Sequence, residues 1–94
     1  LEGLKKTMVQ IEYSHEFEKQ ASKLELRLQK KLAKLLGLLA KNHYDPLLHT
    51  KSLSETFIGI LSFRVTRDWR VTFHLASPDT ICLLEVKHRK DIYR

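Results

Sequence analysis

The residues of this chain best suited to chemistry are arginines that recur along its C-terminal half. Arg64, Arg70 and Arg89 fall in three successive stretches of alternating apolar and polar residues, and Lys87 precedes the last of them. Arginine presents a planar fork of N–H donors that matches the oxygens of a phosphate or carboxylate. If the three stretches are neighbouring strands, these cations gather on one face of a sheet. The pattern therefore predicts an anion-binding surface.

Four other side chains are of types that can transfer protons, although the pattern alone does not assign them that role. His49 and Lys51 lie in a polar segment, His88 ends the last stretch, and Tyr93 lies close to the C-terminus. Histidine, lysine and tyrosine all serve as general acids or bases. Each also has a structural interpretation, because a lone histidine is often a packing residue and Tyr93 is equally suited to anchoring the C-terminus in the core. No group of His, Cys, Asp and Glu has the spacing of a metal-ligand set, so we expect neither a metal nor a cofactor.

Size and charge narrow the class of protein. The chain has 94 residues, 43% hydrophobic and 30% charged, which is typical of one globular domain. Its net charge is +6, and the halves 1–46 and 47–94 each carry +3, so the positive field belongs to the folded body. Such a field favours nucleic acid, acidic proteins or anionic membranes as partners. The chain has one cysteine, Cys82, and no apolar stretch of the ~20 residues that a membrane helix needs, so we expect a cytoplasmic protein.

The N-terminal half predicts one strand and two helices. We expect residues 1–7 to be flexible sequence upstream of a single domain at residues 8–94. Met8–Tyr13 alternates apolar and polar side chains, as a half-buried strand does. Ser14 is a predicted N-cap, and leucines at steps of three or four continue a helical pattern to about Ala40. One helix of this length would be long for so small a domain, so we expect a break at Ser22–Glu25 and a helical hairpin.

The C-terminal half predicts three antiparallel strands. They are Phe57–Val65, Trp69–Ala76 and Thr80–His88, and the links between them are too short for anything but hairpins. Together with the first strand they predict a four-stranded sheet in an α+β domain, with the helical hairpin on one face.

Strand alternation divides these side chains between two faces, because residues two apart point the same way. Those predicted to face the helices are Phe57, Leu61, Phe63 and Val65, then Val71, Phe73 and Leu75, then Cys82, Leu84 and Val86. Those predicted on the open face are Ser62, Arg64, Arg70, Thr72, His74, Glu85, Lys87 and Arg89. An open sheet face is polar by default, so a solvated surface is the competing interpretation. Three arginines with a single acid among them favour a binding site.

An ordered series of motifs resembles the RelE/ParE toxin superfamily. The motifs are Ser-Phe-Arg-Val at 62–65, Asp-Trp-Arg-Val at 68–71 and His-Arg-Lys-Asp-Ile-Tyr at 88–93. The resemblance extends from Met8 onward and agrees with the α+β order. It implies the toxin of a toxin–antitoxin pair. Its RelE branch cleaves mRNA in the ribosomal decoding site, whereas its ParE branch inhibits DNA gyrase without chemistry of its own.

The resemblance also implies roles for individual residues. Arg70 and Arg89 match family arginines expected to stabilise the phosphate, and Tyr93 matches a terminal tyrosine. His49 and Lys51 lie where the family places lysines or a histidine, and Asp68 and Trp69 resemble a pair found in the YafQ-like branch. His88 is a further candidate acid or base. Expected RNA contacts are Arg64, Lys87 and the helix lysines Lys30, Lys31 and Lys34.

The implied reaction is attack of an RNA 2′-hydroxyl on the adjacent phosphate, with release of the 5′-oxygen and no need for a metal. The implied partners are a cognate antitoxin, in a possible heterotetramer, and the ribosome with its mRNA, but no membrane. The alternatives are a ParE-like gyrase inhibitor and a non-catalytic basic RNA-binding domain.

Overall fold

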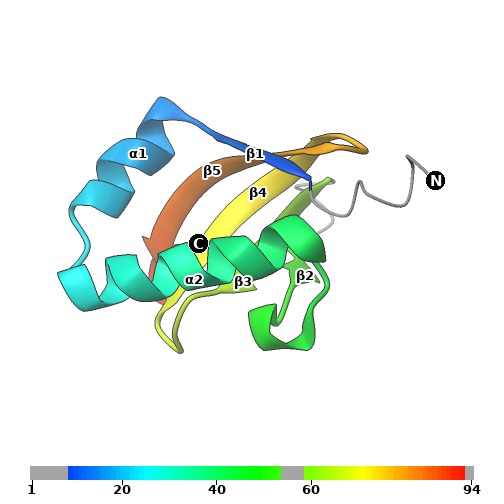
Figure 1. Ribbon diagram of the computed structural model, residues 1–94. Coiled ribbons are helices and arrows are strands. Elements are labelled where there is room, and N and C mark those ends of the chain that lie inside the picture. Colours follow the sequence, from blue (N-terminus) through cyan, green and yellow to red (C-terminus); the bar gives the residue numbers. More distant parts are fainter. Residues whose placement is uncertain (1–8, 54–58, 93–94) are drawn as a thin grey trace.

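The computed structural model describes residues 9–53 and 59–92 of the chain. In order, the elements are β1 (Gln10–Tyr13), α1 (His15–Ser22), α2 (Leu26–Lys41), the short 3₁₀-helix η2 (Pro46–Leu48), β2 (Lys51–Ser52), β3 (Ile60–Arg64), β4 (Trp69–Ser77), β5 (Thr80–His88) and α3 (Arg89–Ile92) (Figure 1). The predicted domain boundary at Met8, the predicted core residue Phe57 and the predicted site residue Tyr93 lie outside the described residues. No helix within the described part of the chain is long and apolar enough to cross a membrane.

The sheet is mixed and has the strand order β1-β5-β4-β3-β2. β1 runs parallel to β5, and the other neighbours are antiparallel. The α+β class and the C-terminal meander are therefore confirmed, but the sheet has five strands and not four. The additional strand is β2, which pairs Lys51 with Ser62 and Ser52 with Leu61. A strand of two residues has no alternation from which the sequence could predict it.

The helices share one hydrophobic core with one face of the sheet. α2 crosses in front of the sheet in Figure 1 and buries Leu28, Leu32, Leu35 and Leu39. Opposite them, the sheet buries Phe63, Val71, Phe73 and Leu83 completely. The predicted break is confirmed, because α1 ends at Ser22 and α2 begins at Leu26. Burying each of these large side chains contributes about 1.5–3 kcal/mol, so this face of the sheet holds the fold together.

A bulge in β5 corrects the predicted division of side chains. Phe73 lies opposite Leu83 and Thr72 lies opposite Glu85, which leaves Leu84 without a partner on β4. The extra residue reverses the alternation, as β-bulges do. The residues of β5 that face the core are therefore Ile81, Leu83 and Val86. Cys82 and Leu84 were wrongly predicted to face the core, whereas Glu85 and Lys87 lie on the open face as expected.

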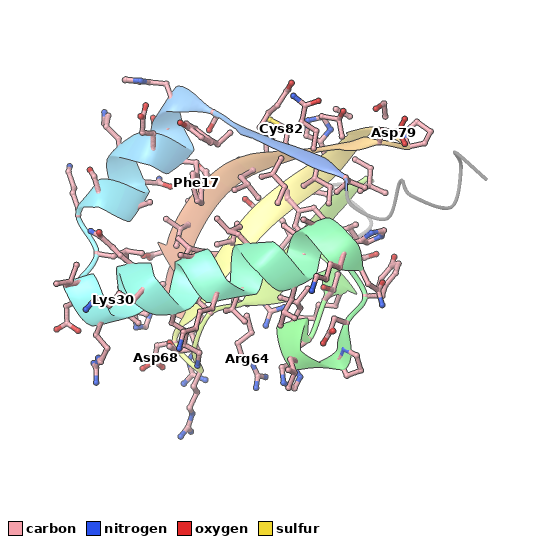
Figure 2. All side chains as sticks on the ribbon, viewed as in Figure 1. Phe17, Lys30, Arg64, Asp68, Asp79 and Cys82 are labelled. Carbon is pink, nitrogen blue, oxygen red and sulfur yellow. The ribbon has the colours of Figure 1, made fainter. Side chains whose placement is uncertain are left out.

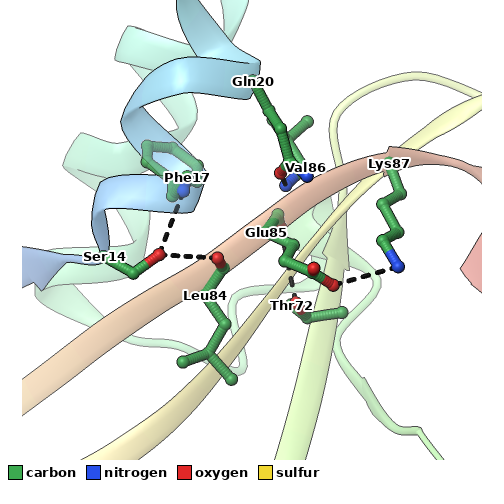
Figure 3. A network of polar contacts seen from close by, with 8 residues as sticks. All are labelled: Ser14, Phe17, Gln20, Thr72, Leu84, Glu85, Val86 and Lys87. Carbon is green, nitrogen blue, oxygen red and sulfur yellow. Dashed lines mark hydrogen bonds and ion pairs between the residues drawn. The ribbon is translucent and has the colours of Figure 1, made fainter.

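Helix α1 satisfies the backbone of this bulge. The Ser14 hydroxyl donates to the Leu84 carbonyl over 2.7 Å and accepts the Phe17 N–H as the N-cap of α1 (Figure 3). The Val86 N–H donates to Oε1 of Gln20 over 2.8 Å. Both backbone groups would otherwise lack a ladder partner, and an unpaired buried group is costly. Through these contacts α1 fixes the direction in which Glu85 and Lys87 project.

Replacing Ser14 with alanine is expected to lower the free energy of unfolding by about 1–3 kcal/mol, because one hydroxyl serves both the helix cap and the bulge carbonyl. Urea denaturation followed by circular dichroism measures the change. Ser22→Ala is the matched control, since its exposed hydroxyl donates only to the Lys19 carbonyl. Equal effects of the two substitutions would show that the bulge does not depend on Ser14.

Candidate functional site

Three cations lie side by side across the open face of the sheet. Arg64 on β3 is directly opposite Arg70 on β4, which is directly opposite Lys87 on β5. Directly opposed residues point to the same face, so the predicted gathering of these side chains is confirmed. We call Arg64, Arg70 and Lys87 the cation row. Like charges directly opposite one another destabilise a sheet, so the cations of the row need compensating contacts.

The members of the cation row differ in exposure. Arg64 is exposed. Lys87 is partly exposed and pairs with Glu85 over 3.1 Å. Arg70 is only 5% exposed. Its Nε donates to Oγ of Ser62 over 3.0 Å, and its Nη2 donates to the carbonyls of Ser62 and His49. Arg70 therefore does not project into solvent as the open-face prediction implied, and its direct contact with a phosphate stays a prediction.

The open face of the sheet is partly covered by α3. α3 packs against β4 and β5, and Ile92 of α3 is buried. Ile92, Leu84, Ile60 and Thr72 line one groove on this side of the sheet. The face predicted to be wet thus carries a small apolar surface of its own beside the cation row.

A second group of functional candidates lies where β3 joins β4 and where β5 runs into α3. The Arg89 N–H donates to the Asp68 carbonyl over 2.7 Å, and Arg89 Nε lies 3.7 Å from Oδ1 of Asp68. The rings of Trp69 and His88 meet edge to face, with centroids 5.4 Å apart. We call Asp68, Trp69, His88 and Arg89 the turn-end cluster. Figure 2 shows Asp68 and Arg64 at this same end of the sheet.

His88 lies on the helix side of the sheet. It is directly opposite Trp69 and points toward the helices, one position beyond the cation row. Its Nδ1 accepts the Lys90 N–H over 3.3 Å. A neutral imidazole whose Nδ1 accepts a hydrogen bond carries its proton on Nε2. Nδ1 is therefore engaged by the protein, and Nε2 is the ring nitrogen left for another partner.

His49 is tied to the cation row through its backbone. It is exposed, follows η2, and accepts a hydrogen bond from Arg70 at its carbonyl, over 2.8 Å. Lys51 lies on β2 opposite Ser62, in the row that continues to Thr72 and Glu85. Both predicted residues thus lie on the β2 side of the cation row. His74, four residues beyond Arg70 on β4, is roughly 13 Å away along the strand and belongs to neither group.

A basic cleft beside the turn-end cluster was not predicted. It has a volume of about 640 Å³ between the α1–α2 connection and the β3–β4 turn. Lys23, Arg27, Lys31 and Arg67 line it together with Asp68 and Trp69. Of the helix lysines predicted to contact RNA, Lys31 lines this cleft. Lys30 and Lys34 are exposed and line a second groove on α2 together with Lys31. The spacing of four between Arg27 and Lys31 was the available sequence signal, since it places both on one side of a helix.

The repulsion within the cation row gives a testable consequence. Arg64→Gln is expected to raise the free energy of unfolding by about 0.2–1 kcal/mol, because it removes a like charge opposite Arg70. Arg64→Lys keeps the charge at similar length and is expected to give no such gain. The difference, measured by urea denaturation, should shrink at high salt. A gain of the same size for both substitutions would mean that charge is not its cause.

Comparison with known proteins identifies the fold. No family model and no curated protein sequence matches the chain. Among solved structures, it is similar to the E. coli DinJ–YafQ toxin–antitoxin complex (20% identity, 93% of this chain and 99% of that chain, TM-score 0.74). It is also similar to a YoeB/ParE toxin from Agrobacterium tumefaciens (13% identity, 85% and 98%, TM-score 0.73). A third similar structure is the toxin–antitoxin complex RelBE2 from Mycobacterium tuberculosis (21% identity, 87% and 99%, TM-score 0.70).

The protein therefore has the fold of the RelE/ParE-type toxins, as its sequence motifs implied. At these identities the likeness concerns the fold. It extends over nearly the whole length of each of the three similar chains.

Proposed function

We propose that this chain is the toxin of a toxin–antitoxin pair and that it cleaves mRNA on the ribosome. The observation that carries the proposal is the meeting of the cation row with the turn-end cluster at one end of a sheet that has the toxin fold. Two of the similar structures are toxin–antitoxin complexes, which supports a cognate antitoxin as the protein partner.

The chemistry we propose is attack of a 2′-hydroxyl on the adjacent phosphodiester. Such a step needs a base for the hydroxyl, cations at the phosphate oxygens and an acid for the leaving 5′-oxygen. Arg64, Lys87 and Arg89 are exposed or partly exposed cations on or beside the open face, so we assign them to the phosphate. His49 is the proposed base, with Lys51 as the neighbouring cation. His88, one position beyond the cation row, is the proposed acid in its imidazolium form. We assign Tyr93, at the C-terminus, to stacking on a base.

The ribosome is the proposed site of action because the basic surface extends beyond what one phosphate requires. The cleft lined by Lys23, Arg27, Lys31 and Arg67 adjoins the turn-end cluster, and Lys30 and Lys34 continue the positive surface along α2. Surfaces of this kind bind RNA backbones without regard to sequence.

Transcript-end mapping after induction in cells tests the proposal. The wild-type protein is expected to create new 5′ ends within translated codons, and the double substitution Arg64→Ala with Lys87→Ala is expected to abolish them while the protein stays folded. Intact transcripts with a DNA-damage response would support a gyrase inhibitor instead. Neither response, with the protein folded and present, would support a non-catalytic RNA-binding domain. Co-expression of the neighbouring short reading frame is expected to suppress the effect if it encodes the antitoxin.

A further inference from the structure

The backbone of His49 has a conformation that side chains rarely adopt. Its φ is 50° and its ψ is 47°, the only left-handed conformation of a non-glycine residue among those the structure describes. A residue with a Cβ is held in this region only where its surroundings impose it, and such residues gather at functional sites. Something in the structure must therefore hold His49 in place.

Contacts at the backbone of His49 do so. The His49 N–H donates to the Pro46 carbonyl over 3.3 Å as the C-cap of η2, and the His49 carbonyl accepts from Arg70. The guanidinium of Arg70 thus reaches from β4 both to β3 and to the segment after η2. It binds Oγ and the carbonyl of Ser62 on β3, at 3.0 and 3.2 Å, and the carbonyl of His49 at 2.8 Å. Since Arg70 is 5% exposed, these bonds form away from bulk solvent, where they are stronger.

The shape of the guanidinium suits this task better than it suits a phosphate in this position. A planar guanidinium holds two acceptors at a fixed distance and angle. It therefore fixes the segment after η2 relative to strand β3. A lysine would offer one mobile charge and would reach either Ser62 or His49 with less definition. Leu48, which is completely buried, fixes the other side of the same segment.

We propose that Arg70 is a positioning residue that holds His49 at the site, and that it acts through His49 without touching the phosphate. This inference rests on the proposed cleavage reaction, in which His49 takes part. It replaces the expectation that the strand arginine is itself a phosphate ligand. It also separates Arg70 from its exposed neighbour Arg64, although the two lie directly opposite each other.

A double-mutant cycle on purified protein tests the inference. Single-turnover cleavage of mRNA on programmed ribosomes is measured for Arg70→Lys, His49→Ala and the combination. Arg70→Lys is expected to lower the rate ~10²-fold, since small displacements of a catalytic group have effects of this size. In the His49→Ala background it is expected to have almost no further effect. The matched comparison is Arg64→Ala, whose effect should multiply with that of His49→Ala. If the effects of Arg70→Lys and His49→Ala also multiply, Arg70 acts independently of His49 and the inference is wrong.

A second measurement does not depend on activity. With ¹³C,¹⁵N-labelled histidine, Arg70→Lys and Arg70→Gln are expected to shift the backbone resonances of His49 away from left-handed values, whereas Arg64→Lys leaves them in place. If the wild-type protein cleaves no RNA, the proposed function fails, but this shift still shows whether Arg70 holds His49. Unchanged His49 resonances in both folded Arg70 variants would overturn the inference.

Discussion

Arg89→Ala is expected to lower the rate of mRNA cleavage ~10²–10³-fold while leaving the protein folded, because a preorganised charge at the phosphate is worth ~2.7–4 kcal/mol in the transition state. The guanidinium of Arg89 is available for this role. Its side chain is 54% exposed, and its Nε lies 3.7 Å from the Asp68 carboxylate, beyond the usual length of a hydrogen bond. A phosphate oxygen would therefore compete with Asp68 easily.

The fold is expected to tolerate this substitution for a specific reason. α3 is joined to the β3–β4 turn by the backbone N–H of Arg89, which donates to the Asp68 carbonyl over 2.7 Å. Alanine retains that bond. The ion pair that is removed is exposed, and such pairs contribute at most ~1 kcal/mol. A large loss of activity would thus report on catalysis and not on unfolding.

Single-turnover cleavage on programmed ribosomes, with the folded fraction checked by circular dichroism, measures the effect. Lys19→Ala is the control, since it removes the same charge from an exposed position on α1 that belongs to neither the cation row nor the turn-end cluster. Arg89→Lys is expected to fall between wild type and Arg89→Ala, because lysine keeps the charge without the fork. Equal rates for Arg89→Ala and Lys19→Ala would remove Arg89 from the proposed site.

The sequence predicted the fold wherever one pattern dominated. The leucines of α2 fit only a helix, Ser14 fits an N-cap, and the alternation of β4 fits only a strand. The structure contains all three. The prediction failed at Leu84, because nothing in the sequence of β5 indicates that this strand contains a bulge with one additional residue. The bulge becomes favourable only when α1 supplies the Ser14 hydroxyl and the Gln20 amide from about 70 residues earlier in the chain.

The sequence predicted which residues make up the candidate site but not how deeply each of them is buried. Alternation placed Arg64, Arg70 and Lys87 on one face, and the register confirms it. Alternation says nothing of what covers a face, so it could not predict that Arg70 lies buried against the carbonyl of His49. Whether an arginine binds a ligand or the protein itself depends on contacts between distant segments, which a periodic pattern does not contain.

The exposed lysines of α2 carry the second large expected effect. Replacing Lys30 and Lys34 with glutamine is expected to make the affinity for ribosomes less dependent on salt. The slope of log affinity against log salt concentration should fall by roughly 1.5–2, close to one for each phosphate that a lysine no longer neutralises. The two residues lie four apart on α2, so they project from the same side of the helix. Neither forms an ion pair within residues 9–53 and 59–92, so their charge is available to an external partner.

A matched pair of substitutions separates this effect from a change in net charge. Lys19→Gln with Lys41→Gln also removes two positive charges, but from exposed positions on α1 and at the end of α2. Sedimentation binding between 50 and 200 mM salt is expected to give the wild-type slope for this control. Over that interval the gap in affinity between wild type and the Lys30, Lys34 variant should narrow about tenfold. Equal slopes for the two double variants would mean that the affinity for ribosomes depends only on the total charge of the protein. This side of α2 would then be an ordinary solvated surface.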